Sequence, residues 1–208
     1  MENEKIIIRI IRYQFKIETI RKLIQELQQF IGPIELEPVS AKAIFKLERR
    51  LKKKLSDEYI AFLYYIGSGR LDYVFYNPQQ VWEKYQHNCT LERYNRKLSR
   101  LENVKVLTIK HLQDEINKKS EGICITGCKD GAIPIMDQGC IGTVLLIIRG
   151  ELEETVWEGA YESFYFYPLK NPVFSTNEGL PFATVSFLTW IEDYLKRRVH
   201  FYQIKKGK

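Results

Sequence analysis

The chain has 208 residues, of which 45% are hydrophobic and 13% aromatic, and this composition excludes a disordered chain. The net charge of +6 is uneven, because residues 1–110 hold 21 basic against 13 acidic side chains while residues 111–208 hold 11 against 13. A basic half of this kind indicates either an acidic partner or a solvated helical surface. Four cysteines are too few for a disulfide scaffold, so we expect reduced thiols in a cytoplasmic protein.

The apolar run at positions 6–11 is interrupted by Arg9 and is too short to span a bilayer. Two glutamates precede it and do not suit the basic start of a signal peptide, so we expect no membrane association. A helical stripe then covers residues 20–31, with Thr19 as the expected cap, and Gly32-Pro33 ends this first predicted helix.

Two consecutive amphipathic helices are predicted over residues 40–66, and Ser40 begins the first of them, whose exposed side is basic. A new helix is expected after Ser56, because a capping hydroxyl is followed by two acids that face the positive end of the helix dipole. The GSG segment at 67–69 ends this helix, and Asn77-Pro78 is the start signal of another one.

A helical stripe continues to residue 101, and the apolar period then changes from helical to extended. Segments rich in β-branched and aromatic residues alternate with turn residues, and a last helix closes the chain. We expect strands at 104–109, 122–127, 132–136, 142–149 and 161–167, a short helical piece at 112–117, and Phe187, Ile191, Tyr194 and Leu195 on the inner side of the last helix. This order predicts an α+β fold with N-terminal helices, a largely antiparallel meander sheet and a closing helix.

The stretch ICITGCKDGAIPIMDQGC at 123–140 contains Cys124, Cys128 and Cys140. Two residues four positions apart on an extended strand are separated by about 13 Å, too far to share one zinc ion with Zn–S bonds of about 2.3 Å. We therefore expect buried free thiols and no metal. The metal hypothesis returns if the three sulfurs lie close to a common point.

The glycines of the same stretch are typical of hairpin turns at 129–131 and 137–139 rather than of a phosphate loop. The sequence has no zinc-protease, hydrolase-nucleophile or dinucleotide-binding motif, and its three histidines are scattered. Basic stretches at 49–55 and 93–100 could neutralise phosphates, but no nucleic-acid recognition module surrounds them. We expect a protein that is not an enzyme and has no catalytic residue, cofactor or metal.

The segment AKAIFKLERRLKKKLSDEYIAFLYYIGSG at 41–69 resembles the opening of the SUKH superfamily, which contains bacterial immunity proteins against secreted polymorphic toxins and a fungal regulator of cell-wall synthesis. The family pattern is a helix with a glutamate, a Leu-Pro break, and a tyrosine-bearing helix that ends in an Asn-Gly turn. The matching positions are Glu48, Leu55, Tyr59, Phe62, Leu63 and Gly69. Ser56 stands in place of the proline, and Gly67-Ser68-Gly69 in place of the Asn-Gly turn.

The resemblance continues more loosely through the glycine-punctuated stretch at 123–147 and the segment VSFLTWIEDYL at 185–195, and it covers roughly residues 38–197. It implies a SUKH-like α+β domain at 38–208, with residues 1–37 as a helical extension packed on it. It also implies a non-enzymatic binding protein, so our leading hypothesis is an immunity protein that binds and neutralises a cognate toxin domain. The alternatives are a regulatory or scaffold protein of the same fold and a basic nucleic-acid-associated protein.

Exposed aromatic side chains are the natural anchors of a protein interface, although large aromatics are more often buried in the core. The candidates for partner binding are Tyr73, Tyr76, Trp82, Trp157 and Tyr161. Because the chain is basic, we expect either a toxin with an acidic surface or an interface on the less basic sheet half.

Overall fold

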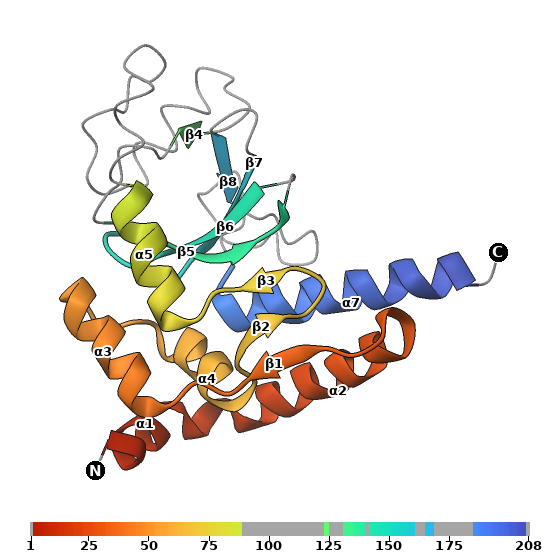
Figure 1. Cartoon of the computed structure of the whole chain (residues 1–208), viewed down its shortest axis with the longest axis horizontal. Helices are drawn as coiled ribbons and strands as arrows, with labels where there is room; N and C mark the ends of the chain where they lie inside the picture. Colours follow the sequence, from red (N-terminus) through yellow and green to blue (C-terminus); the bar gives the residue numbers. More distant parts are fainter. Residues whose placement is uncertain are drawn as a thin grey trace. The chain divides into compact units, whose positions relative to one another are not determined.

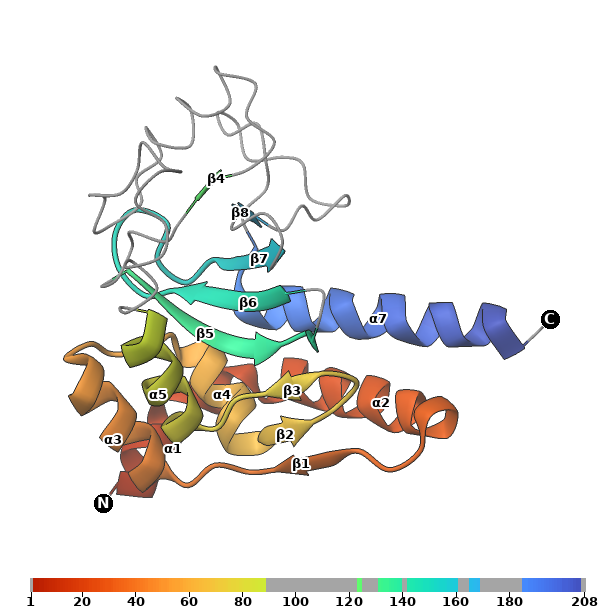
Figure 2. The same cartoon turned by 45° about the horizontal axis from the view of Figure 1, so that its top comes forward.

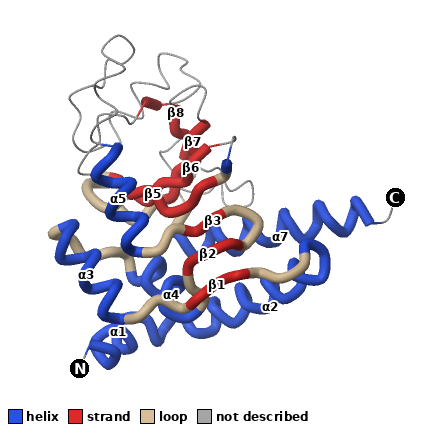
Figure 3. Tube along the Cα trace, in the orientation of Figure 1, coloured by secondary structure: helices blue, strands red, loops and turns tan. Residues whose placement is uncertain are grey.

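The structure is a computed structural model that describes residues 2–88, 123–124, 131–139, 142–160, 165–168 and 185–206. As predicted, the chain is an α+β protein with N-terminal helices, an antiparallel meander and a closing C-terminal helix (Figures 1 and 3). It divides into two compact units, one formed by Met1–Asn77 with Ser186–Lys208 and the other by Pro78–Val185. The domain boundary expected between residues 37 and 38 falls inside the first unit.

The helices of the first unit follow one another closely from the N-terminus. They are α1 (Glu2–Ile10), the 3₁₀ helix η1 (Ile11–Tyr13), α2 (Gln14–Ile31), α3 (Ala41–Leu51), α4 (Asp57–Tyr65) and α7 (Phe187–Lys206). The predicted cap at Thr19 was wrong, because α2 begins five residues earlier and the Thr19 hydroxyl donates to the Phe15 carbonyl inside the helix at 3.2 Å. No capping side chain is needed there, since η1 already supplies backbone acceptors, as the hydrogen bond from Gln14 N–H to the Ile11 carbonyl shows.

The two serine caps that were predicted are confirmed. Ser40 Oγ accepts from the Ala43 N–H at 3.3 Å, and Ser56 Oγ accepts from the Tyr59 N–H at 3.2 Å. Each serine satisfies one of the amides that the first helical turn leaves without a carbonyl partner. Lys52 takes a left-handed conformation with φ of 52° at the end of α3 and turns the chain towards α4.

Helices α2 and α7 lie side by side and run in the same direction (Figures 1 and 2). Lys16 near the start of α2 donates to Thr189 near the start of α7 at 2.8 Å, and Gln203 near the end of α7 donates to Glu26 of α2 at 2.9 Å. These contacts join residues more than 170 positions apart, so the closing helix fixes the N-terminal segment in the first unit.

An aromatic core holds α4 and α7 together. The ring of Phe187 packs edge-on against Tyr59 and Phe62, with centroid distances of 5.0 and 5.3 Å. Such edge-to-face pairs add to the stabilisation that comes from burying the rings. The four residues predicted on the inner side of the last helix, Phe187, Ile191, Tyr194 and Leu195, are all buried.

The short strands of the first unit are β1 (Glu35–Glu37), β2 (Ser68–Arg70) and β3 (Val74–Phe75), and consecutive members pair in antiparallel fashion. Glycines at 67 and 69 allow β1 to approach β2 closely. A Cβ atom at Gly67 would lie 2.2 Å from the Glu37 carbonyl oxygen, and one at Gly69 would lie 2.1 Å from the Glu35 carbonyl oxygen. Both glycines have positive φ angles, 120° and 130°, which side-chain-bearing residues rarely adopt.

The second unit combines a helix with a five-stranded part of the sheet. Its elements are α5 (Pro78–Asn88), β4 (Ile123–Cys124), β5 (Ala132–Asp137), β6 (Gly142–Ile147), β7 (Val156–Ala160) and β8 (Tyr165–Pro168). Strands β5 to β8 form the antiparallel meander, and α5 begins at the predicted proline and contacts β5. The helices predicted up to residue 101 and at 112–117, and the strand at 104–109, lie outside the described residues.

Two details of the sheet differ from the prediction. Among the described strands, β4 pairs with β8 and is not a neighbour of β5, although the predicted hairpin would place β4 and β5 side by side. Strand β7 was not predicted, because its glutamate and glycine dilute the alternation of apolar residues. The turn at 137–139 is confirmed: Gly139 has φ of 65°, and its N–H donates to Asp137 Oδ1 at 2.8 Å.

Candidate partner-binding surfaces

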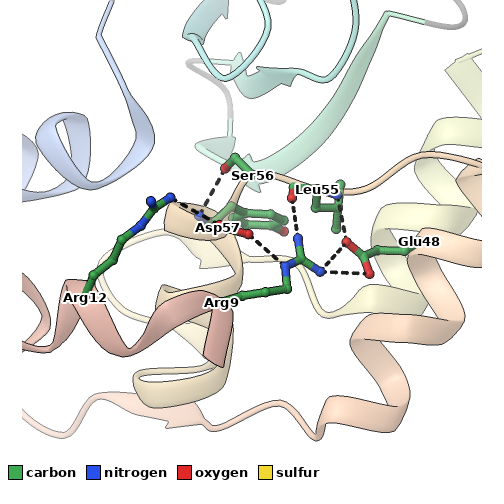
Figure 4. A network of polar contacts seen from close by, with 7 residues as sticks. Arg9, Arg12, Glu48, Leu55, Ser56 and Asp57 are labelled. Carbon is green, nitrogen blue, oxygen red and sulfur yellow. Dashed lines mark hydrogen bonds and ion pairs between the residues drawn. The ribbon is translucent and has the colours of Figure 1, made fainter. Parts of the chain in front are cut away.

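Helix α1 places Arg9 beside the junction of α3 and α4 (Figure 4). Its guanidinium donates from Nε to Asp57 Oδ1 at 2.8 Å, from Nη1 to both oxygens of Glu48 at 3.0 and 3.2 Å, and from Nη2 to the Leu55 carbonyl at 2.9 Å. Burial lowers the pKa of Arg9, but the hydrogen bonds and charges of Asp57 and Glu48 outweigh it and hold this pKa above its ordinary value. Arg9 is therefore a permanent cation that ties α1 to the first unit.

Glu48 completes this network from the other side. Besides Arg9, it accepts a hydrogen bond from the Leu55 N–H at 2.9 Å, in the turn between α3 and α4. The glutamate that carries the family resemblance thus has a structural task here: it joins α1 to this turn. The resembling positions Tyr59, Phe62 and Leu63 are buried in the core, so they build the fold and are not exposed to a partner.

The five aromatic residues selected from the sequence do not form one surface in the described part of the chain. Trp157 is fully buried and its indole N–H donates to Thr155 Oγ1 at 2.8 Å, and Tyr76 is also buried. Tyr73 and Trp82 are partly exposed, and they belong to different units. Tyr161 lies outside the described residues. Neither Trp157 nor Tyr76 offers its ring to a partner in this structure.

Tyr73 belongs to an aromatic and polar cluster around Arg198 of α7. The guanidinium carbon of Arg198 lies 5.2 Å from the ring centre of Tyr202, 5.3 Å from that of Phe201 and 6.0 Å from that of Tyr73. Arg198 also forms an ion pair with Asp72. Burial, and after it the charge of Asp72, raises the pKa of Tyr194 in this cluster above its ordinary value.

An exposed apolar row on the N-terminal helices was not predicted. The side chains of Ile8, Ile11 and Phe15 are 77%, 54% and 88% exposed. They are three and four positions apart and belong in turn to α1, η1 and α2, so the row follows the chain across the junction of these helices. Ile6 and Ile10 on the other face are fully buried. We define Ile8, Ile11 and Phe15 as the apolar row.

A signal for the apolar row was present in the sequence. The segment IIIRIIRYQF carries more large apolar residues than one buried helix face can take up. Once residues 6, 10 and 17 are assigned to the buried face, the apolar residues left over at 8, 11 and 15 fall on the outside.

Within the described ranges, no group of three histidine, cysteine, aspartate or glutamate residues could hold a metal ion. Cys128, Cys140 and the basic segment 93–100 lie outside those ranges, so whether the three cysteine sulfurs come together is not tested. No helix in the described part of the chain is long and apolar enough to cross a membrane. Comparisons of the chain with models of protein families, with curated proteins and with solved structures found no match.

Proposed function

We propose that this chain is a non-enzymatic binding protein, namely an immunity protein that binds and neutralises a cognate bacterial toxin domain in the cytoplasm. The observation that carries this proposal is the apolar row, because three large apolar side chains exposed within eight positions of the chain are costly in water unless a partner covers them. Phe15 is the most exposed of the three and suits the role of the central anchor.

The way in which α1 is held supports the same proposal. Arg9 fixes α1 to the α3–α4 junction through three acceptor groups, and Arg12 binds the second oxygen of Asp57 at 3.2 Å. A surface on a rigid helix loses little conformational entropy when it binds, which favours affinity. The resemblance of residues 41–69 to immunity proteins of the SUKH superfamily indicates the class of partner.

The proposal can be tested by co-expression with the toxin domain encoded beside the gene. The wild-type chain is expected to rescue the growth of cells that express this domain. The double variant Ile8→Asp/Phe15→Asp is expected to lose the rescue, since it places two charges on the apolar row. A chain that folds but fails to rescue would remove the support for an immunity function.

A matched control exists on α7, where Phe201 and Ile204 are about half exposed. The ring of Phe201 already makes cation–π contacts with Arg198 and Lys205, so part of its surface is covered within the chain. The variant Phe201→Asp/Ile204→Asp should therefore keep the rescue. Equal loss in both double variants would mean that the apolar row is not the specific contact.

A further inference from the structure

Helix α3 carries a basic row along its outer face. Lys42, Lys46 and Arg49 are exposed and are spaced by four and three residues, so they lie on one side of the helix. Ile44 and Leu47 on the other side are buried. At 1.5 Å of rise per residue, the three cations extend over about 10 Å. We define Lys42, Lys46 and Arg49 as the basic row.

Acidic neighbours do not neutralise this row along its own helix. Glu48 is the only acid between residues 41 and 56, and it is buried and bound to Arg9. Within the described part of the chain, Lys42, Lys46 and Arg49 take part in no ion pair. The exposed Lys52 and Lys54 follow directly after the row and add to its positive potential.

From this arrangement we infer that the basic row of α3 docks an acidic helix of the protein partner. This inference rests on the proposed function and names the chemistry of its partner. An α-helix with carboxylates every three or four residues has the same repeat as the row, so its charges meet the three cations in register. The three side chains are exposed, so a partner can reach them from solvent.

The charge density of the row favours an acidic helix over nucleic acid. Duplex DNA carries one charge per about 1.7 Å, or roughly six over the length of the row, which is twice the number of cations. The number of phosphates that a protein neutralises sets its nonspecific affinity for DNA and the salt dependence of that affinity, and the basic row neutralises at most three. An acidic helix presents about three carboxylates over the same length, which equals the number of cations in the basic row.

The experiment measures binding of a labelled helical peptide of about 20 residues with glutamates every three or four positions, by fluorescence anisotropy in low salt. The full-length chain should bind this peptide and should bind its glutamine counterpart at least about tenfold more weakly. The variant Lys46→Glu/Arg49→Glu should lose at least about tenfold in affinity. The milder Lys46→Gln/Arg49→Gln should lose less, and it guards against misfolding of the reversed variant.

The control is Lys22→Glu/Lys205→Glu, which changes the net charge by the same amount at two exposed positions of α2 and α7. It should change the affinity less than about threefold. Equal weakening in control and test variants, no binding of the peptide, or tighter binding of duplex DNA or single-stranded RNA of equal charge would each overturn the inference.

The rescue assay separates this inference from the proposed function. If the wild type rescues cells from the toxin domain and Lys46→Glu/Arg49→Glu rescues equally well, the docking inference fails and the immunity function stands. If the peptide binds through the basic row but the wild type does not rescue, the docking surface stands and the immunity function fails.

Discussion

Arg9 of α1 and Arg198 of α7 are buried to a similar degree, with 19% and 24% of their side chains exposed, but they have different surroundings. Arg9 directs its N–H groups at two carboxylates and one carbonyl. Arg198 lies among aromatic rings with one carboxylate, and its Nε has no acceptor among the described residues. The first environment fixes the position of a helix through several directional bonds, whereas the second stabilises a charge mainly through rings and one carboxylate, with one further hydrogen bond from Arg198 Nη2 to Tyr202 Oη at 3.2 Å.

Of substitutions at these two arginines, one at Arg9 should lower the free energy of unfolding more. Substitution of Arg9 by Met leaves Glu48 buried without its cation, and we expect a loss of about 3 kcal/mol in the free energy of unfolding. Arg9→Lys should recover only part of this loss, because lysine cannot bind three acceptors in a planar fork. Urea unfolding measures both values. The exposed neighbour Arg12, replaced by Met, is the control and should cost no more than about 0.5 kcal/mol.

A smaller effect is expected at Arg198. Arg198→Met removes one ion pair, one hydrogen bond to Tyr202 and the cation–π contacts but keeps an apolar side chain against the rings, so we expect a loss of about 1.5 kcal/mol. The same urea unfolding experiment gives the value, with Arg197→Met as an exposed control on the same helix turn. A loss as large as that of Arg9→Met would contradict the distinction between the two arginines.

The Arg198 region should also respond to alkaline pH. The pKa of Tyr194 is raised in the folded chain, so the stability that this group contributes is complete below about pH 10 and falls as the unfolded chain releases its proton first. Between pH 9 and 11, the wild type should lose up to about 1.4 kcal/mol more than Tyr194→Phe. Parallel unfolding curves of the two proteins over this range would show that the pKa of Tyr194 is not raised.

The smallest effect on stability is expected at the apolar row. Phe15→Ala should change the free energy of unfolding by no more than about 0.5 kcal/mol, because its ring is mostly in water already. Ile17→Ala, two residues further on the buried face, should cost about 3 kcal/mol in the same measurement. Similar values at both positions would mean that Phe15 is packed within the chain.

Local signals in the sequence were sufficient for several elements of the fold. Ser40, Ser56 and Pro78 were identified as helix starts, because capping hydroxyls and an N-terminal proline act over one helical turn. Helix α1 fell within the helical extension expected at residues 1–37, but its bounds were not predicted. The pairing of β4 with β8 joins segments about 40 residues apart, which no local pattern records.

The candidate site was harder to predict than the fold. The identity of an aromatic residue does not tell whether its side chain is buried or exposed. Its burial depends on which residues the fold places around it. Trp157 is buried and lies opposite Leu145 on the adjacent strand, a partner set by sheet register. The position of α1 likewise depends on the contact of Arg9 with Glu48, which bridges 39 positions of the chain.

The close approach of β1 to the glycines at 67 and 69 restricts which residues related chains can carry at these two positions. Strand β1 fits only because two side chains are missing from the segment that receives it. The same GSG segment is where the chain departs from the Asn-Gly turn of the SUKH pattern. Strand β1 and the two glycines should therefore be inherited together: a related chain that keeps β1 has no space for a Cβ atom at either position, and a chain without β1 loses this clash but still has to relax the positive φ angles.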